Sequence, residues 1–163
     1  MNRTRIDTRD QALWSPDVTV ATVVARDGRF LLVEERVDGE LVLNQPAGHL
    51  EPDESLAEAA RRESLEETGW DVEPTGLIGV YQWTSPRGRD FLRFAFAADA
   101  VRHHASRRLD QGIERTLWLT REEIAAAAPR LRSPMVLRCV DDWLAGRRLP
   151  LAALAVVPSG ASA

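Results

Sequence analysis

The chain has 163 residues, the usual size of one domain, and its 44% hydrophobic and 28% charged content is ordinary for a soluble globular protein. All 21 basic residues are arginine, which excludes a lysine Schiff base, a P-loop lysine and a lysine general base. The net charge of −4 argues against a general affinity for nucleic acid, and no apolar run approaches the roughly 20 residues of a membrane span.

The chain begins with a polar stretch, and we expect residues 1–16 to form a loose segment without the apolar region of a secretory signal. Three strands are predicted before the first helix, over residues 18–25, 29–35 and 40–44. The turn signal Asp27-Gly28 makes the first two a hairpin, and Asp38-Gly39 marks the next turn. Residues 45–53 contain two prolines and a glycine, which predicts a loop.

Good helix formers fill residues 56–67 and predict a helix there. Ser55 and Glu58 have capping-box spacing, so the serine hydroxyl can accept from an early backbone N–H. Gly69 is placed to end the helix in the left-handed conformation.

Strands are then predicted over 77–83, 91–98 and 113–119, and helices over 121–128 and 134–146. Thr120 caps the first of these helices and Pro129 stops it. This order indicates one α/β domain, with a mixed sheet between helices, over residues 17–155 and a flexible tail over 156–163.

The single cysteine, Cys139, lies in the apolar periodic part of the last helix, which predicts a small core residue. One cysteine excludes an intramolecular disulfide, and with only three histidines the chain gives no indication of a Cys/His zinc site. We therefore expect a cytoplasmic enzyme or binding protein.

The acidity of the chain is concentrated in one segment. Residues 48–70 hold seven acidic residues against two arginines, a net −5, whereas all other residues together carry +1. At about 100° per residue, Glu63, Glu66 and Glu67 share one helix face within roughly a 100° arc. Partly buried carboxylates in a cluster repel one another unless a cation neutralises them. Oxygen ligands without histidine or cysteine favour magnesium or manganese.

The segment resembles a known motif, the Nudix box, through Gly48, Glu54, Arg62, Glu63, Glu66, Glu67 and Gly69. Ser64 departs from it, because the family usually has an aliphatic residue there that packs on the sheet; we expect looser packing at this point. The stretches NQPAGHLE (44–51), YQW (81–83), FLRFAF (91–96) and LRSP (131–134) are similar to bacterial Nudix phosphatases. The likeness runs from about residue 18 to residue 151.

The resemblance implies a Nudix α/β/α sandwich and a metal-dependent hydrolase, with Mg²⁺ or Mn²⁺ as cofactor. Its implied substrates are nucleoside di- and triphosphates and the hydroxymethylpyrimidine pyrophosphate of thiamin metabolism, with release of orthophosphate. One alternative is a pyrophosphohydrolase of dinucleotides or nucleotide sugars such as ADP-ribose. A non-catalytic nucleotide-sensing module is disfavoured, because all the box glutamates are present. The expected partner is a small phosphorylated molecule, not nucleic acid or a membrane, with a monomer as default and a homodimer left open.

By the same resemblance, the metal is held by Glu63, Glu66 and Glu67 together with the backbone carbonyl of Ala47 or Gly48. Arg62 orients the glutamates, with Glu54 as its partner. The general base is expected beyond the box, and the candidates are Glu114 and Asp110. Gly112 stands where some members carry that acid.

Substrate contacts are predicted from residue chemistry. Tyr81 and Trp83 offer aromatic surfaces for stacking. Arg93 alternates with apolar neighbours and is placed to bind phosphate. Asn44 and Gln45 lead into the metal loop and are expected to bond a pyrimidine or ribose edge, and His49 is a further candidate.

Overall fold

The computed structural model describes residues 13–157, so the predictions made for residues 1–12 and 158–163 lie outside the described residues. Seven strands form the sheet: β1 (Asp17–Arg26), β2 (Arg29–Val37), β3 (Glu40–Asn44), β4 (Ala47–His49), β5 (Trp70–Thr84), β6 (Asp90–His103) and β7 (Ile113–Leu119). The helices are α1 (Leu56–Thr68), α2 (Arg121–Ala126) and α3 (Met135–Leu144), with short 3₁₀ turns at Ala128–Arg130 and Leu151–Ala153.

The sheet divides into two leaves that meet at the predicted hairpin. One leaf runs β4–β1–β6–β5 and the other β3–β2–β7. β1 and β2 pair only beside their turn, at Ala25–Phe30 and Arg26–Arg29, and then part. β1 and β6 are parallel and the remaining pairs antiparallel, so the sheet is mixed, as predicted.

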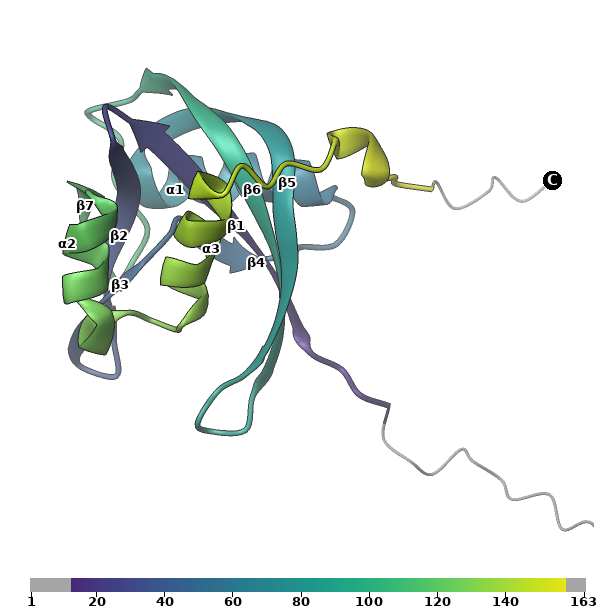
Figure 1. Cartoon of the computed structure of the whole chain (residues 1–163), viewed down its shortest axis with the longest axis horizontal. Helices are drawn as coiled ribbons and strands as arrows, with labels where there is room; N and C mark the ends of the chain where they lie inside the picture. Colours follow the sequence, from purple (N-terminus) through teal and green to yellow (C-terminus); the bar gives the residue numbers. More distant parts are fainter. Residues whose placement is uncertain (1–12, 158–163) are drawn as a thin grey trace, which may run out of the picture.

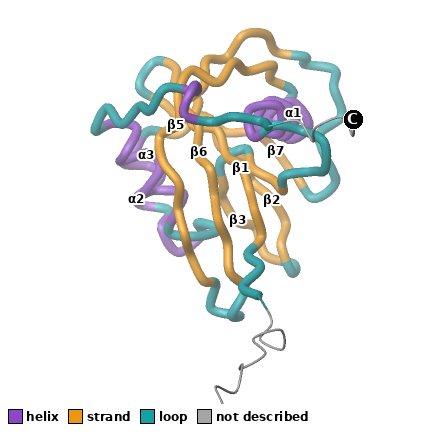
Figure 2. The backbone as a smooth tube through the Cα atoms, turned by 90° about the vertical axis from the view of Figure 1, so that its right-hand side faces the viewer, coloured by secondary structure: helices purple, strands orange, loops and turns teal. Residues whose placement is uncertain are grey.

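Helices cover both faces of the sheet (Figures 1 and 2). Because successive strand residues point to opposite faces, β1 supplies two cores. Val20 packs with Ala59 of α1, and Val23 packs with Val136 and Cys139 of α3. The predicted α/β/α sandwich is therefore confirmed, and Cys139 is fully buried in its core.

The predicted caps of α1 are confirmed. The Ser55 hydroxyl accepts from the Glu58 N–H, the Glu58 carboxylate accepts from the Ser55 N–H, and Gly69 closes the helix at φ 70°. Thr120 and Glu123 form a second capping box at α2. No helix within residues 13–157 is both long and apolar enough to cross a membrane.

One strand was not predicted, and two others are longer than predicted. β4 lies inside the expected loop, because three residues between prolines give no visible alternation. β5 begins at Trp70, seven residues before the predicted start, and β6 continues to His103. Register shifts at Asp71/Val72, Pro74/Gly76 and Leu77/Gly79 interrupt the two-residue period that reveals a strand, so the pattern hides the first half of β5.

Candidate active site

The glutamate face of α1 lies directly against β4. The Ala47 N–H donates to the Glu67 carboxylate, with 2.9 Å between nitrogen and oxygen. A β-carbon added at Gly48 would overlap the Glu63 carboxylate, so only glycine lets strand and carboxylate approach this closely. Val20 of β1 pairs with Gly48 and fixes β4 in place. The predicted metal residues of helix and loop are thus brought together.

Arg62 ties this face together. Its guanidinium donates to both Glu54 oxygens at 2.7 and 3.0 Å, to Glu63 at 2.7 Å and to Glu66 at 3.2 Å. It also donates to the His49 carbonyl at 3.0 Å, which links α1 to the end of β4. These hydrogen bonds raise the pKa of Arg62 and lower the pKa of Glu54, so both stay charged. The arrangement predicted for Arg62 and Glu54 is present in the structure.

Burial raises the pKa values of Glu63 and Glu67. Glu63 is 9% exposed, and loss of hydration raises its pKa, with the Arg62 hydrogen bond opposing the rise. Burial raises the pKa of Glu67 to about 9, opposed by the Ala47 N–H and increased by the charges of Glu63 and Glu35. Glu67 is therefore protonated at neutral pH unless a cation compensates its charge.

The donor set fits a hard divalent ion, because it consists of carboxylate oxygens close to the backbone of Ala47 and Gly48. It is not a preformed shell: within residues 13–157, no three histidine, cysteine or acidic side chains are already grouped around one ion position. Glu63 instead bonds Arg62, and Glu67 bonds Ala47.

A cleft of about 600 Å³ opens beside Ala47 and Gly48 and runs between the two leaves of the sheet. Trp83 stacks on Phe91 along its wall, with ring centroids 5.6 Å apart and planes at 28°. The polar and charged residues that line it include Thr19, Glu35, Asn44, His49, Arg93, Arg132 and Ser133. Of the predicted substrate residues, Asn44, Trp83 and Arg93 line this cleft.

Gln45, also predicted to contact substrate, is not among the residues that line the cleft. It is 1% exposed, and its amide nitrogen donates to the Val136 carbonyl at 2.6 Å. Its amide oxygen accepts from Arg93 at 3.4 Å. Gln45 therefore holds the Arg93 guanidinium in position through this hydrogen bond.

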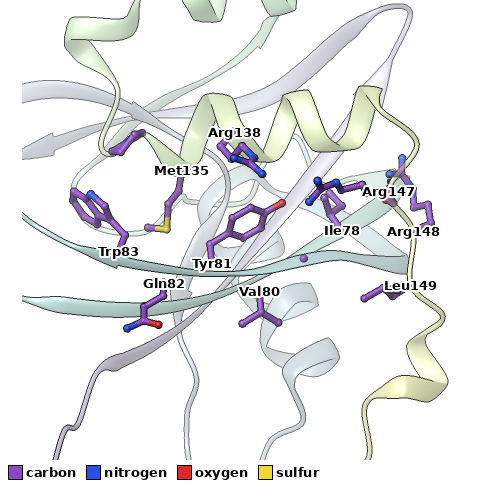
Figure 3. Close-up of a pocket in the computed structure, with 12 residues that line it drawn as sticks. Ile78, Val80, Tyr81, Gln82, Trp83, Met135, Arg138, Arg147, Arg148 and Leu149 are labelled. Atoms are coloured by element: carbon purple, nitrogen blue, oxygen red, sulfur yellow. Dashed lines mark hydrogen bonds between the residues drawn. The ribbon is translucent and has the colours of Figure 1, made fainter.

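Tyr81 is also placed differently from Trp83. Its hydroxyl donates to Asp142 at 2.9 Å, and its ring faces α3 (Figure 3). It lines a second cavity of about 720 Å³ between β5 and α3, whose wall Trp83 and Met135 share with the cleft. Burial raises the pKa of Tyr81, so the hydroxyl remains a donor. Tyr81 thus lines the second cavity and not the cleft, and its stacking role stays a prediction.

The two candidate bases lie in different environments. Glu114 is about half exposed and pairs with Arg36 at 2.9 Å on the outside of β7. Asp110 adjoins the end of α1, where its N–H donates to the Glu66 carbonyl at 3.0 Å. The charge of Asp110 contributes to the raised pKa of both Glu63 and Glu67, which places it near the box carboxylates.

Sequence reasoning missed Thr19, Glu35, Arg132 and Ser133 as cleft residues. Thr19 carried a weak signal as a polar side chain in a mainly apolar strand, but Thr22 of the same strand shares that signal and does not line the cleft. Ser133 and Arg132 belong to the LRSP stretch, whose position beside β3 depends on the Arg132 N–H bond to the Leu43 carbonyl. That contact joins segments far apart in the sequence and has no local pattern.

Comparison with known proteins agrees with this geometry. Residues 15–139 match the family described as "NUDIX domain". The chain is 44% identical over 139 residues to "Phosphatase NudJ" of Escherichia coli K12, which covers 85% of this chain and 90% of that protein. A "NUDIX hydrolase from Nitrosomonas europaea" has a TM-score of 0.86 and 46% identity over 88% of this chain and 98% of its own. An ADP-ribose pyrophosphatase from Streptococcus suis shares the fold, with a TM-score of 0.62 and 16% identity over 82% of this chain and 93% of its own.

Proposed function

The chain belongs to the Nudix family and is a hydrolase of phosphoric anhydride bonds in small phosphorylated molecules; within that family, we propose that it is a cytoplasmic phosphatase that releases orthophosphate with Mg²⁺, or with Mn²⁺ in its place. Its proposed substrates are nucleoside di- and triphosphates and the hydroxymethylpyrimidine pyrophosphate. The similarity to Phosphatase NudJ over most of both chains supports orthophosphate release.

One observation carries the proposal. Two carboxylates, the buried Glu63 and the partly buried Glu67, meet β4 at one end of a cleft whose wall is aromatic and which is also lined by the buried Arg93. Buried carboxylates call for a cation, and the remainder of the cleft offers an apolar surface for an organic group. A diphosphate joined to a ring has both parts.

Glu63, Glu66 and Glu67 are proposed to hold the metal together with the carbonyl of Ala47 or Gly48. When bound, the metal neutralises phosphate oxygens and polarises the phosphorus under attack. Arg62 keeps the carboxylates oriented through its four hydrogen bonds to Glu54, Glu63 and Glu66. Asp110 is the preferred base and takes the proton of the attacking water, because it lies beside the box whereas Glu114 is paired with Arg36.

Hydrolysis within a nucleotide sugar such as ADP-ribose is the alternative. The likeness to the Streptococcus suis enzyme concerns the fold alone and gives that alternative no particular support.

A substrate panel with Mg²⁺ distinguishes the two. GDP, CDP, nucleoside triphosphates, hydroxymethylpyrimidine pyrophosphate and ADP-ribose are incubated with the enzyme, and the products are assayed for orthophosphate, pyrophosphate and monophosphates. We expect orthophosphate from the diphosphates. Pyrophosphate from triphosphates, or monophosphates from ADP-ribose alone, would replace the proposal by the alternative, and no turnover at all would overturn it.

A further inference from the structure

Four buried polar atoms without a partner surround the same cleft. Thr19 Oγ1, Asn44 Oδ1, Arg93 Nε and Ser133 Oγ have no hydrogen-bond partner among the residues that the structure describes. Each of these side chains is at most 6% exposed, and all four line the cleft. Folded proteins satisfy most buried polar groups, so four such atoms around one cavity indicate a ligand that completes them.

These atoms come from both leaves of the sheet. Thr19 and Arg93 are register partners on β1 and β6, and Asn44 ends β3. Ser133 lies in the segment that enters α3. A ligand that contacts all four is therefore held at the junction of separate elements, where only the folded chain assembles the set.

The hydrogen-bonding sense of two members is fixed. Arg93 Nε is a donor, and its guanidinium has no carboxylate within salt-bridge distance among residues 13–157. Burial lowers its pKa, and the charges of Glu35 and Glu67 oppose that fall. Asn44 Oδ1 is an acceptor, because the amide nitrogen of Asn44 donates to Glu35 at 3.3 Å. The ligand must offer Arg93 an acceptor and Asn44 a donor.

A phosphate group does not meet this requirement. An ionised phosphate has acceptor oxygens and no donor, so it leaves Asn44 Oδ1 unsatisfied. In the proposed function the phosphates have a place elsewhere, at the metal held by the glutamates next to Gly48. Thr19 pairs with both His49 of β4 and Arg93 of β6, so the backbones of His49 and Arg93 lie two strand spacings, about 10 Å, apart.

Trp83 and Phe91, the stacked pair in the cleft wall, add an aromatic surface beside the polar set. We propose that Arg93, Asn44, Thr19 and Ser133 bind the polar edge of a planar nitrogen heterocycle that carries both an acceptor and an amino or N–H donor. This subsite selects heterocycle-bearing diphosphates over other diphosphates, and Gln45 is the positioning residue that holds Arg93. The inference rests on the proposed function for its substrate class. It assigns Arg93 to the heterocycle of the substrate, in place of the phosphate contact expected from the sequence.

The test compares CDP, whose cytosine has both groups on one edge, with methyl diphosphate, which has no ring. We expect the wild-type kcat/KM for CDP to exceed that for methyl diphosphate at least about 100-fold, because a site built for hydrogen bonds discriminates strongly. Asn44→Ala and Ser133→Ala lower the CDP value about 10-fold, mainly through KM, and change the methyl diphosphate value less than twofold. Ser106→Ala, an exposed serine outside the cleft, is the matched control and leaves both values unchanged.

Calorimetric binding of CMP, measured without turnover, separates this inference from the proposed function. If neither diphosphate is hydrolysed but CMP binds the wild type and binds the two variants at least about 10-fold more weakly, the ring subsite stands and the phosphatase proposal fails. If both variants keep the wild-type ratio of CDP to methyl diphosphate and the wild-type CMP affinity, the subsite is overturned whatever the enzyme hydrolyses. A variant whose circular dichroism departs from wild type is replaced by Asn44→Ser or Ser133→Gly.

Discussion

Gly48 is the residue on which the glutamate face depends most directly, because any β-carbon there would overlap the Glu63 carboxylate. We predict that Gly48→Ala displaces this carboxylate and lowers kcat/KM at least about 10-fold, with a higher Mg²⁺ concentration for half activation. The melting temperature changes little, since the displaced group is the free end of a side chain. Magnesium titration of activity checks the prediction, and an unchanged half-activation concentration would remove Glu63 from the metal site.

Asp110 and Glu114 offer a matched pair for identifying the base. We predict that Asp110→Asn lowers kcat about 100-fold with little change in KM, because a general base contributes typically 10²–10⁴ to the rate. Glu114→Gln stays within about twofold of wild type, since its carboxylate pairs with Arg36 on the surface. Steady-state kinetics of both variants decide the matter, and the reverse ranking would restore Glu114 as the base.

At the scale of elements, α1 meets the sheet through a polar contact that the motif did not predict. The Ser64 hydroxyl lies 2.8 Å from the Thr22 hydroxyl of β1 and donates to the Ala60 carbonyl at 2.8 Å. Ser64 is fully buried. A hydrogen-bonded pair of hydroxyls thus stands at this interface in place of the aliphatic contact that is usual in the family, and the expected looser packing stays a prediction.

The pair predicts a coupling energy. Thr22→Val and Ser64→Ala each lower the free energy of unfolding by about 1 kcal/mol, the usual net value of a hydrogen bond. The double variant loses less free energy of unfolding than the sum of the two single losses, because either substitution alone already breaks the hydrogen bond between the hydroxyls. Urea unfolding of the four proteins measures this difference, and strict additivity would show that the hydroxyls do not interact.

Local patterns predicted most elements but not how they meet. Capping chemistry at Ser55 and Gly69 defined both ends of α1, because caps are local. β4 was invisible, since its three residues form a strand only through their bonds to β1. Whether a residue is placed by local or by tertiary contacts also separates the site residues that the sequence predicted from those that it did not. Glu63 and Glu67 share one helix face, whereas Ser133 and Thr19 come together only in the tertiary structure.

At the scale of the whole molecule, the desolvated carboxyl group of Glu67 couples stability to pH. The pKa of Glu67 is about 9 in the folded protein, against an ordinary value of 4.5. Between these values the folded state binds a proton that the unfolded state has released, so stability falls as pH rises. We predict that the metal-free protein loses thermal stability from about pH 5 to about pH 9.

Glu67→Gln removes this titration and flattens the dependence, while it lowers kcat at least about 100-fold through loss of a ligand charge. Mg²⁺ raises the melting temperature of the wild type most at high pH, because it binds the ionised carboxylate. Thermal melts with and without metal across this range check the prediction. A wild type and variant with equal pH slopes would show that Glu67 does not titrate as stated.

The rate at which a thiol reagent modifies Cys139 reports on local opening of the protein. Cys139 is the only thiol of the chain, it is fully buried between α3 and the sheet, and burial raises its pKa to about 11. A thiol reagent therefore modifies the protein only when α3 lifts away, so the modification rate measures local opening. We predict that Tyr81→Phe, which breaks the bond to Asp142, speeds modification several-fold without a comparable loss of global stability. Equal rates in both proteins would mean that the thiol is reached only through complete unfolding.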